Sequence, residues 1–267
     1  MKIFKWFSIS DLALGTWKMG GGFWQADYSN DQNDIKAIKR AIELGITAID
    51  TAEMYGNGHA EELVGKAIKD FKRDDLFIIT KVWPNHARYE DTIKSAIASS
   101  KRLGTYIDLY LLHWPSEVPI CETIKAFEDL VDRGIIRFFG LSNFKWKEIE
   151  KAKECLRKYE IVAVENHYSL WDRSDEDTLN YANKNGLLYL SYTPIEKGRI
   201  ASDKILVEMG KKYNKTPIQI AINWYIQIPS LVPIIKSSNV KHLEENIGAL
   251  GWSLTKEDWN KISESYK

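Results

Sequence analysis

The sequence predicts a closed barrel of eight parallel strands, each followed by a helix. Eight short apolar runs recur along the 267 residues, at intervals of about 26–34 residues that widen before the last, the length of one β-loop-α-loop unit. These runs are almost entirely apolar, which indicates strands buried on both faces of a parallel sheet. Because the composition does not shift along the chain, one (β/α)8 barrel domain over residues 1–267 is favoured over two doubly wound halves.

The elements follow in order from this periodicity. The strands are expected at LALGTW (12–17), ITAID (46–50), LFIITKV (76–82), IDLYLLH (107–113), IIRFFGL (135–141), IVAVENH (161–167), LLYLSY (187–192) and LVPIIK (231–236). Helical spacing of apolar residues predicts helices at 34–44, 59–71, 92–103, 120–131, 147–156 and 175–185, and a pair across 203–226. The residues before Leu12 are expected to form a small N-terminal cap over the barrel floor.

Composition excludes several kinds of partner. Lys+Arg and Asp+Glu each number 37, so the net charge is zero and no nucleic-acid partner is expected. Apolar runs fall short of the roughly 18–20 residues of a membrane span, and the first residues are too short for a signal peptide. Cys121 and Cys155 show neither metal-ligand nor disulfide spacing, so we interpret them as buried free thiols, consistent with a reducing cytoplasm.

Polar side chains interrupt or follow the apolar runs where the strands are expected to end. They are Asp50, Lys81, His113, Asn143, Glu165, His167, Tyr192 and Lys236. In barrels of this kind catalytic side chains gather at the C-terminal ends of the strands. Taken singly, Asp50 is as readily a helix cap, and His113 a satisfied buried histidine. A ring of such residues around one barrel mouth instead predicts an active site.

Four of these positions predict acid–base chemistry when taken together. A tyrosine with an ordinary pKa of about 10 is a reluctant proton donor near neutrality. An ammonium at Lys81, kept charged by Asp50, is expected to lower the pKa of Tyr55 and make it a general acid. His113 is expected to orient a carbonyl oxygen toward Tyr55. The set suits protonation of an oxygen while another group attacks the carbon.

The motifs that hold these residues resemble the aldo-keto reductase family. LALGTW, DTAEMYGNGHAEELVGKAI, TKVWP, IDLYLLHWP, GLSNF, LSYTP and PIIKSSNVKHLEEN occur in the family's order and spacing, over residues 9–252. The resemblance implies an NADPH-dependent reductase of aldehydes and ketones on a TIM barrel. It also implies that Asp50, Tyr55, Lys81 and His113 form the catalytic tetrad, with Tyr55 the acid in reduction and the base in oxidation.

The resemblance further implies an NADP cofactor lying extended across the barrel mouth. Ser142 and Asn143 match residues that hold the nicotinamide carboxamide, and Tyr192 matches the ring that stacks on it. Lys236, Ser237 and Ser238 match the contacts of the ribose 2′-phosphate. The other matched positions are Gly15, Thr16, Trp17 and Asp50, then Thr193, Pro194, Ile195 and Gly198 in the segment over the pyrophosphate, and Glu245 and Asn246 at the adenine.

Two positions depart from the family pattern. Glu165 stands where many relatives have Gln, and a carboxylate can accept from the carboxamide but not donate to it. His242 stands where NADP-specific members often have Arg, and a histidine is a weaker phosphate clamp. We therefore expect NADPH to be preferred over NADH only moderately. GNGHAE at 56–61 is too weak a glycine pattern for a nucleotide loop and predicts a turn into a helix.

The substrate side is predicted to be aromatic. Trp17, Trp24, Trp83 and Trp114 lie at strand ends or just beyond, so with Tyr55 and His113 they are expected to bind a small carbonyl compound. Larger relatives continue into a C-terminal loop over the substrate, whereas this chain stops soon after LTKED, a predicted helix start. No long substrate loop, an open mouth and tolerant specificity are therefore expected, in a monomer or weak homo-oligomer.

Three other functions remain open from the sequence. Lys81 at a strand end is compatible with a Schiff-base lyase, although pairing with Asp50 would keep it protonated. His113, Glu165 and His167 are compatible with a metal site, although the reductase pattern makes such a site improbable and no metal is expected. Some family members are regulatory subunits that bind cofactor with little turnover, which the intact tetrad disfavours.

Overall fold

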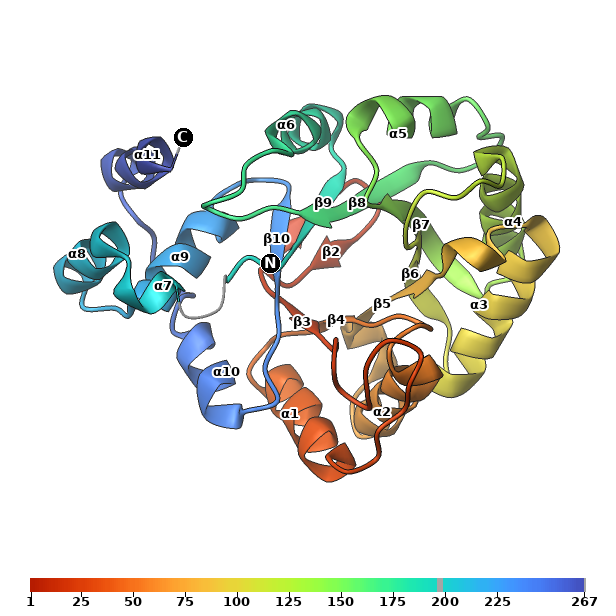
Figure 1. Cartoon of the computed structure of the whole chain (residues 1–267), viewed down its shortest axis with the longest axis horizontal. Coiled ribbons are helices and arrows are strands. Elements are labelled where there is room, and N and C mark those ends of the chain that lie inside the picture. The colour runs from red at the N-terminus through yellow and green to blue at the C-terminus, as the bar shows by residue number, and fades with distance from the viewer. Residues whose placement is uncertain (196–198, 267) are drawn as a thin grey trace.

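Eight parallel strands close into a barrel in the computed structural model, which describes residues 1–195 and 199–266. Around the barrel the order is β10, β3, β4, β5, β6, β7, β8, β9, with β10 paired to both β3 and β9. Figure 1 shows the strands as a central ring inside the helices. The strands are β3 (Ala13–Gly15), β4 (Ala48–Asp50), β5 (Phe77–Val82), β6 (Ile107–Leu112), β7 (Ile136–Ser142), β8 (Ile161–His167), β9 (Leu188–Tyr192) and β10 (Leu231–Ile235). The predicted (β/α)8 barrel and each of its strands are confirmed.

The helices also fall where the periodicity places them. They are α1 (Asp31–Glu43), α2 (His59–Ile68), α3 (Tyr89–Leu103), α4 (Ile120–Asp132), α5 (Trp146–Lys153), α6 (Glu176–Asn185), α8 (Lys204–Tyr213), α9 (Pro217–Ile226) and α11 (Lys256–Ser265). GNG is a short 3₁₀ turn, η1 (Gly56–Gly58), that leads into α2, as predicted. The prediction missed α7 (Arg199–Ser202) and α10 (Val240–Ile247). The signal for α10 was present, because the Asn239 side chain caps it by accepting from the Lys241 backbone N–H.

A hairpin of β1 (Lys2–Ile3) and β2 (Ser8–Ile9) closes the floor of the barrel. The Phe7 ring lies 4.9 Å from the Phe77 ring and 5.0 Å from the Phe138 ring, near the starts of β5 and β7. It thereby joins the apolar cluster that fills the barrel interior. The expected N-terminal cap is confirmed, and the opposite end of the barrel is left as the mouth.

Close packing between β7 and β8 sets the positions of two side chains at that mouth. The register shifts between Phe139 and Gly140, and a Cβ at Gly140 would lie 2.3 Å from the carbonyl oxygen of Ala163. A glycine is therefore required for the two backbones to approach. Beyond this point the register pairs Ser142 with Glu165. The sequence GLS thus delivers Ser142 to the mouth beside the end of β8.

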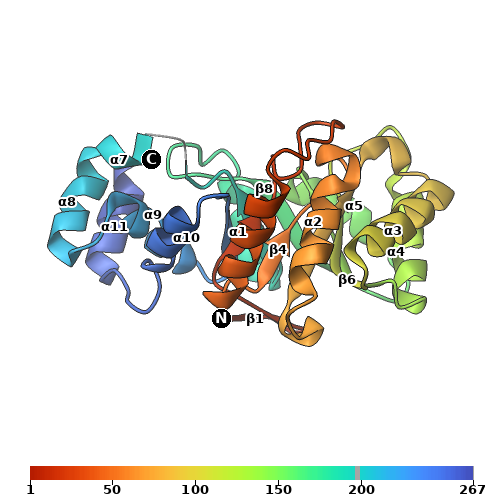
Figure 2. The ribbon, with the colours of Figure 1, turned by 90° about the horizontal axis from the view of Figure 1, so that it is seen from below.

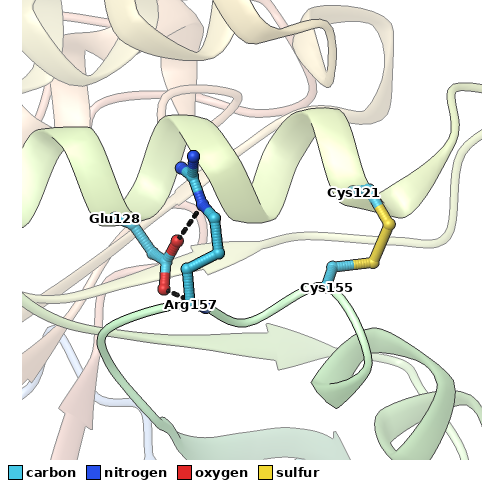
Figure 3. The surroundings of a disulfide bond; sticks show 4 residues. All are labelled: Cys121, Glu128, Cys155 and Arg157. Atoms are coloured by element: carbon cyan, nitrogen blue, oxygen red, sulfur yellow. Dashed lines mark hydrogen bonds and ion pairs between the residues drawn. A yellow bond between two sulfur atoms is a disulfide. The ribbon is translucent and has the colours of Figure 1, made fainter.

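The two cysteines form a disulfide, so the prediction of buried free thiols is wrong. Cys121 in the first turn of α4 is bonded to Cys155, just after α5, with the two Cα atoms 5.1 Å apart (Figure 3). Cys121 is exposed and Cys155 is half-buried. The sequence separation of 34 residues matches no short motif, because the pairing arises from two neighbouring barrel units. Sequence spacing alone cannot show that contact.

The disulfide removes the cysteine argument for a reducing compartment, since such bonds persist mainly in oxidising surroundings. Of the helices in residues 1–195 and 199–266, none combines the length and the apolar character that crossing a membrane would require.

Replacing both cysteines with serine is expected to lower the free energy of unfolding by about 2–4 kcal/mol, because the bond restricts the unfolded chain. Urea unfolding of Cys121→Ser/Cys155→Ser and of the wild type, each with and without reductant, would measure this. Reductant should bring the wild type to the stability of the variant and leave the variant unchanged. Two free thiols titrated in the native wild type would contradict the bond.

Candidate active site

A buried lysine holds two carboxyl groups at the mouth of the barrel. Lys81 of β5 is fully buried, and its Nζ donates to Asp50 Oδ1 at 2.5 Å and to the Thr51 carbonyl at 3.0 Å. The same nitrogen lies 3.3 Å from Glu165 Oε1 at the end of β8. Asp50 and Glu165 are only 3% and 2% exposed. The structure contains the predicted Asp50–Lys81 pair and adds Glu165 as a second acid on the same ammonium.

The two acids keep Lys81 charged. Burial is the largest single influence and lowers its pKa, but Asp50 and then Glu165 outweigh it, so the pKa of Lys81 lies above the ordinary value. A lysine that holds its proton this firmly is a poor nucleophile. The geometry therefore disfavours the Schiff-base alternative.

Tyr55 lies against this group on the loop after β4. The Lys81 ammonium is 5.3 Å from the centroid of the Tyr55 ring, and the tyrosine is 8% exposed. Burial raises the pKa of Tyr55, Asp50 and Glu165 raise it further, and only Lys81 lowers it, so the net direction is upward. The expectation of a lowered pKa was wrong because it counted the ammonium without the burial and the two acids. Tyr55 therefore holds its proton throughout the neutral range.

His113 directly follows β6 and is neutral. Burial lowers its pKa well below the ordinary value, and Lys81 lowers it further. Its ring meets those of Tyr55 and Trp83 edge to face, at 5.9 and 5.3 Å. Its Nδ1 is buried and has no hydrogen-bond partner within the described part of the chain. A buried polar atom without a partner is a candidate anchoring point for a ligand.

Aromatic rings surround the polar group on one side. Trp17 packs edge-on against Tyr55 at 5.0 Å, and Trp24 packs edge-on against Trp83 at 6.1 Å. Trp114 is 44% exposed, and no ring contact joins it to these residues in the described structure. Phe23, which the sequence interpretation missed, is 58% exposed and packs 5.3 Å from Trp83. The sequence feature that could have identified Phe23 is its position beside Trp24 in a glycine-rich loop.

Glu53 is a second residue that sequence reasoning missed. It is 5% exposed, and its Oε1 accepts from the Trp83 backbone N–H at 2.7 Å and contacts His86 Nδ1 at 2.9 Å. It therefore ties the loop after β5 to the loop that carries Tyr55. The sequence feature that could have identified Glu53 is its position within the motif DTAEMYG.

Asn143 is hydrogen-bonded to residues at the ends of four neighbouring strands, β6 to β9. Its Nδ2 donates to the His113 carbonyl at 2.9 Å and to Ser142 Oγ at 3.1 Å, and its backbone N–H donates to the Glu165 carbonyl at 2.9 Å. The Tyr192 hydroxyl donates to Asn143 Oδ1 at 2.6 Å. Asn143 has a positive φ of 64°, which asparagine tolerates better than most residues. The four residues matched to the nicotinamide, Ser142, Asn143, Glu165 and Tyr192, thus lie together.

The remaining matched residues on this rim are held by the scaffold. Thr16, next to Trp17, donates to the Asp50 carbonyl through its backbone N–H at 2.9 Å and its Oγ1 at 3.0 Å. A Cβ at Gly15 would meet Ile234 Cγ2 at 2.8 Å, so glycine permits β3 to pack on β10.

The segment after β9 holds the next matched residues. Thr193 has a positive φ of 55°, the Pro194 carbonyl accepts from the Tyr225 hydroxyl at 2.9 Å, and Ile195 packs against the core. Gly198 lies outside the described residues.

A cavity opens where α10 begins beside α1. It measures about 670 Å³ and is lined by Asn30, Asn33, Lys36, Lys236, Ser237, Ser238, Asn239, Val240 and His242. The two helices lie side by side in both ribbon views (Figures 1 and 2), and Arg40 links α1 to Glu244 of α10 at 2.8 Å. The structure brings Lys236, Ser237, Ser238 and His242 together, as expected, whereas Glu245 and Asn246 are not among the lining residues. Lys36 was missed because a lysine on a helix surface carries no motif.

This cavity and the barrel mouth fit a nicotinamide dinucleotide with a 2′-phosphate. Two lysines and the N-terminus of α10 supply the positive potential that a phosphate requires. At the mouth, the buried His113 Nδ1 and Glu165 Oε2 are polar atoms without a hydrogen-bond partner in the described residues.

The alternative metal site does not assemble. His167 Nδ1 lies 3.3 Å from Asp172, and Glu165 faces Lys81. Among the residues the structure describes, no three His, Cys, Asp or Glu side chains lie close enough together to hold a metal ion.

A closed parallel (β/α)8 barrel with a buried Asp50–Lys81 pair beside Tyr55 at its mouth is the arrangement that the sequence motifs implied for an oxidoreductase. The family model "Aldo/keto reductase family" matches residues 11–267, and the chain belongs to this family. It is 30% identical over 266 residues to the methylglyoxal reductase YeaE of Escherichia coli, covering 97% of this chain and 92% of that protein. It is 33% identical over 247 residues to a glyoxal reductase of Bacillus subtilis, covering 91% and 86%.

Solved structures agree with these relatives. A thermostable aldo-keto reductase bound to the inhibitor epalrestat superposes with a TM-score of 0.94 at 40% identity, covering 98% of both chains. An aldo/keto reductase of Klebsiella pneumoniae in complex with NADP and acetate superposes with a TM-score of 0.87 at 30% identity, covering 97% of this chain and 92% of that one.

Proposed function

We propose that this enzyme reduces small aldehydes and ketones to alcohols with NADPH, with Tyr55 as the proton donor. The observation that carries the proposal is the buried group in which Asp50 holds Lys81 charged beside a protonated Tyr55 and a neutral His113. Proton transfer by a positioned side chain contributes roughly 10²–10⁴ in rate.

Each residue has a separate task in this mechanism. The bound nicotinamide supplies the hydride, and the protein supplies the proton and the orientation. Tyr55 gives its hydroxyl proton to the carbonyl oxygen as negative charge develops there. Lys81 then stabilises the phenolate, and Asp50 keeps the ammonium in place. His113, being neutral, donates a hydrogen bond that directs the oxygen toward Tyr55.

The substrate class follows from the walls of the mouth. Trp17, Phe23, Trp24 and Trp83 give an apolar surface with one polar centre at Tyr55 and His113, which favours small carbonyl compounds with a flat or apolar substituent. Methylglyoxal-like dicarbonyls and aromatic aldehydes meet this description. The names of the two bacterial relatives, methylglyoxal reductase and glyoxal reductase, support dicarbonyls.

The preference for NADPH over NADH is proposed to be moderate and to depend on the cavity beside α10. Lys236 Nζ contacts Ser238 Oγ at 3.2 Å, and Lys36 faces the same cavity from α1. These two cations compensate for the weaker clamp at His242. NADH, which lacks the 2′-phosphate, is proposed to be accepted less well.

Oxidation of NADPH, followed by absorbance with methylglyoxal, an aromatic aldehyde, an aldose and a ketone, tests the function. Steady consumption with one of these is expected, and a higher kcat/KM with NADPH than with NADH. Lys236→Met should lower kcat/KM with NADPH by about tenfold, the loss of one charge-assisted phosphate contact, and leave that with NADH nearly unchanged.

Two results would overturn the proposal. Cofactor binding without turnover of any carbonyl compound would indicate a regulatory subunit instead of an enzyme. Trapping of substrate on Lys81 by borohydride in the absence of cofactor would indicate a Schiff-base enzyme. A clear preference for NADH would remove the cofactor assignment alone.

A further inference from the structure

Glu165 is a buried acid that the proposed mechanism does not use. Its carboxyl lies at the end of β8, 2% exposed, where the strand pairs with Ser142 of β7 and Leu190 of β9. One oxygen is 3.3 Å from Lys81 Nζ, and the other, Oε2, is buried with no hydrogen-bond partner in the described structure. A buried carboxylate with an unsatisfied oxygen is costly, which raises the question of its charge.

One positive charge, on Lys81, is shared by two buried acids, Asp50 and Glu165. Lys81 is the ammonium and Asp50 the competing carboxyl. The phenols of Tyr55 and Tyr192 also face Glu165, whose charge raises the pKa of each. Asp50 has the shorter contact with Lys81, 2.5 Å against 3.3 Å. Two ionised carboxylates would leave a net negative charge in a buried site. The geometry therefore assigns the charge to Asp50 and a proton to Glu165.

The titration of the pair agrees with this assignment. Burial, then the charge of Asp50, raise the pKa of Glu165 to about 8, and Lys81 lowers it only in part. Burial raises the pKa of Asp50 as well, and Lys81, at the shorter contact, lowers it in part. A neutral Glu165 can donate a hydrogen bond, as the amide of Gln does. The expectation that Glu165 can only accept therefore does not hold while it is protonated.

We propose that Glu165 carries a proton when the site is empty or binds reduced nicotinamide, and that its ionisation selectively strengthens binding of oxidised nicotinamide. This inference rests on the proposed function, because Glu165 lies among the residues matched to the nicotinamide. Only the oxidised ring is positively charged, so only that form gains from a carboxylate beside it. The position that departs from the family pattern thus makes the enzyme's choice between the two cofactor forms depend on pH.

The sign of the effect follows from linkage. A ligand that favours the ionised form lowers the pKa of the acid, and its own affinity then rises with pH. An opposite charge within about 4–6 Å moves a carboxyl pKa by about 1–3 units, so the ratio of Kd for NADP to Kd for NADPH should fall by about tenfold or more as pH rises through the transition. Ionisation of the 2′-phosphate affects both cofactor forms alike, so it cancels in the ratio.

Tryptophan fluorescence titrations with NADP and with NADPH, at about pH 6 and about pH 9.5, either side of the pKa of Glu165 near 8, test the proposal. The ratio should fall with pH in the wild type and stay constant in Glu165→Gln, which keeps the donor but cannot ionise. Glu53→Gln, a change at another buried acid of the mouth, should keep the wild-type dependence. An equal pH dependence in Glu165→Gln, or none in the wild type, overturns the inference.

A second measurement follows the proton directly. Infrared difference spectra of the cofactor-free protein should show a protonated-carboxyl band at about pH 6 that disappears by about pH 9.5, in the wild type and not in Glu165→Gln. Absence of this wild-type band contradicts a protonated Glu165. A protein that binds neither cofactor form would refute the proposed function instead, so the two failures are distinguishable.

Discussion

Replacing Tyr55 with phenylalanine is expected to lower kcat for carbonyl reduction by roughly 10²–10⁴, the contribution of a positioned general acid. The phenylalanine ring keeps the contact with Trp17 at the mouth, so the loop after β4 should retain its conformation. Only the proton donor is removed. The measurement is kcat for NADPH oxidation with the best substrate of the carbonyl screen.

Cofactor affinity is the control for this variant. Kd for NADPH from tryptophan fluorescence should stay within about twofold of the wild type, because the hydroxyl acts on the substrate oxygen. The pKa of Tyr55 lies above its ordinary value, so the wild-type rate of reduction should not fall through loss of this proton between about pH 6 and pH 9. A variant that retains wild-type kcat would remove Tyr55 from the mechanism.

Replacing Lys81 with methionine is expected to destabilise the protein by about 3–5 kcal/mol at neutral pH, the usual cost of removing one partner from a buried charge group. Asp50 and Glu165 would remain, 3% and 2% exposed, without their cation. Activity should be lost as well, because the phenolate of Tyr55 would have no stabilising charge. Urea unfolding gives the free energy directly.

The pH dependence of this loss has a definite sign. Without the ammonium, the folded-state pKa values of both carboxyls rise further above their unfolded values. Stability contributed by such groups is present below the unfolded pKa and is lost as pH rises through the folded pKa. The destabilisation should therefore be smaller near pH 5 than near pH 8, by about 1 kcal/mol or more. Adding Asp50→Asn should recover part of the stability, and a pH-independent loss without recovery would contradict the buried-charge account.

Sequence patterns were sufficient for the barrel because each βα unit repeats the same physical signal. A run such as IVAVENH (161–167) is a buried strand with a polar end, and the structure gives β8 the same bounds. The grouping of Asp50, Tyr55, Lys81 and His113 followed from the same rule, since side chains at the ends of parallel strands meet at one mouth.

Properties that depend on several units at once were beyond the sequence. The pKa of Tyr55 depends on burial and on two acids from β4 and β8, whereas sequence reasoning counted a single ammonium. The Cys121–Cys155 bond depends on how α4 packs beside α5, and Lys36 faces the cavity only because α1 lies against α10. In each case the contact arises from the packing of separate βα units, which the sequence pattern of a single unit does not show.

The disulfide, which stabilises the fold, lies at the opposite end of β8 from the candidate active site. Cys155 lies before β8 (Ile161–His167), while Glu165 lies near the other end of that strand, at the mouth. Near the bond, the Glu128 carboxylate accepts from the backbone N–H of Arg157 (Figure 3). It also accepts from the backbone N–H groups of Lys158 and Tyr159, which fixes the entry to β8. Thermal tolerance and substrate choice can therefore be altered independently, the first by changes at this entry and the second by changes in the loops of the mouth. Protein engineering or natural selection could raise thermal tolerance without changing substrate choice.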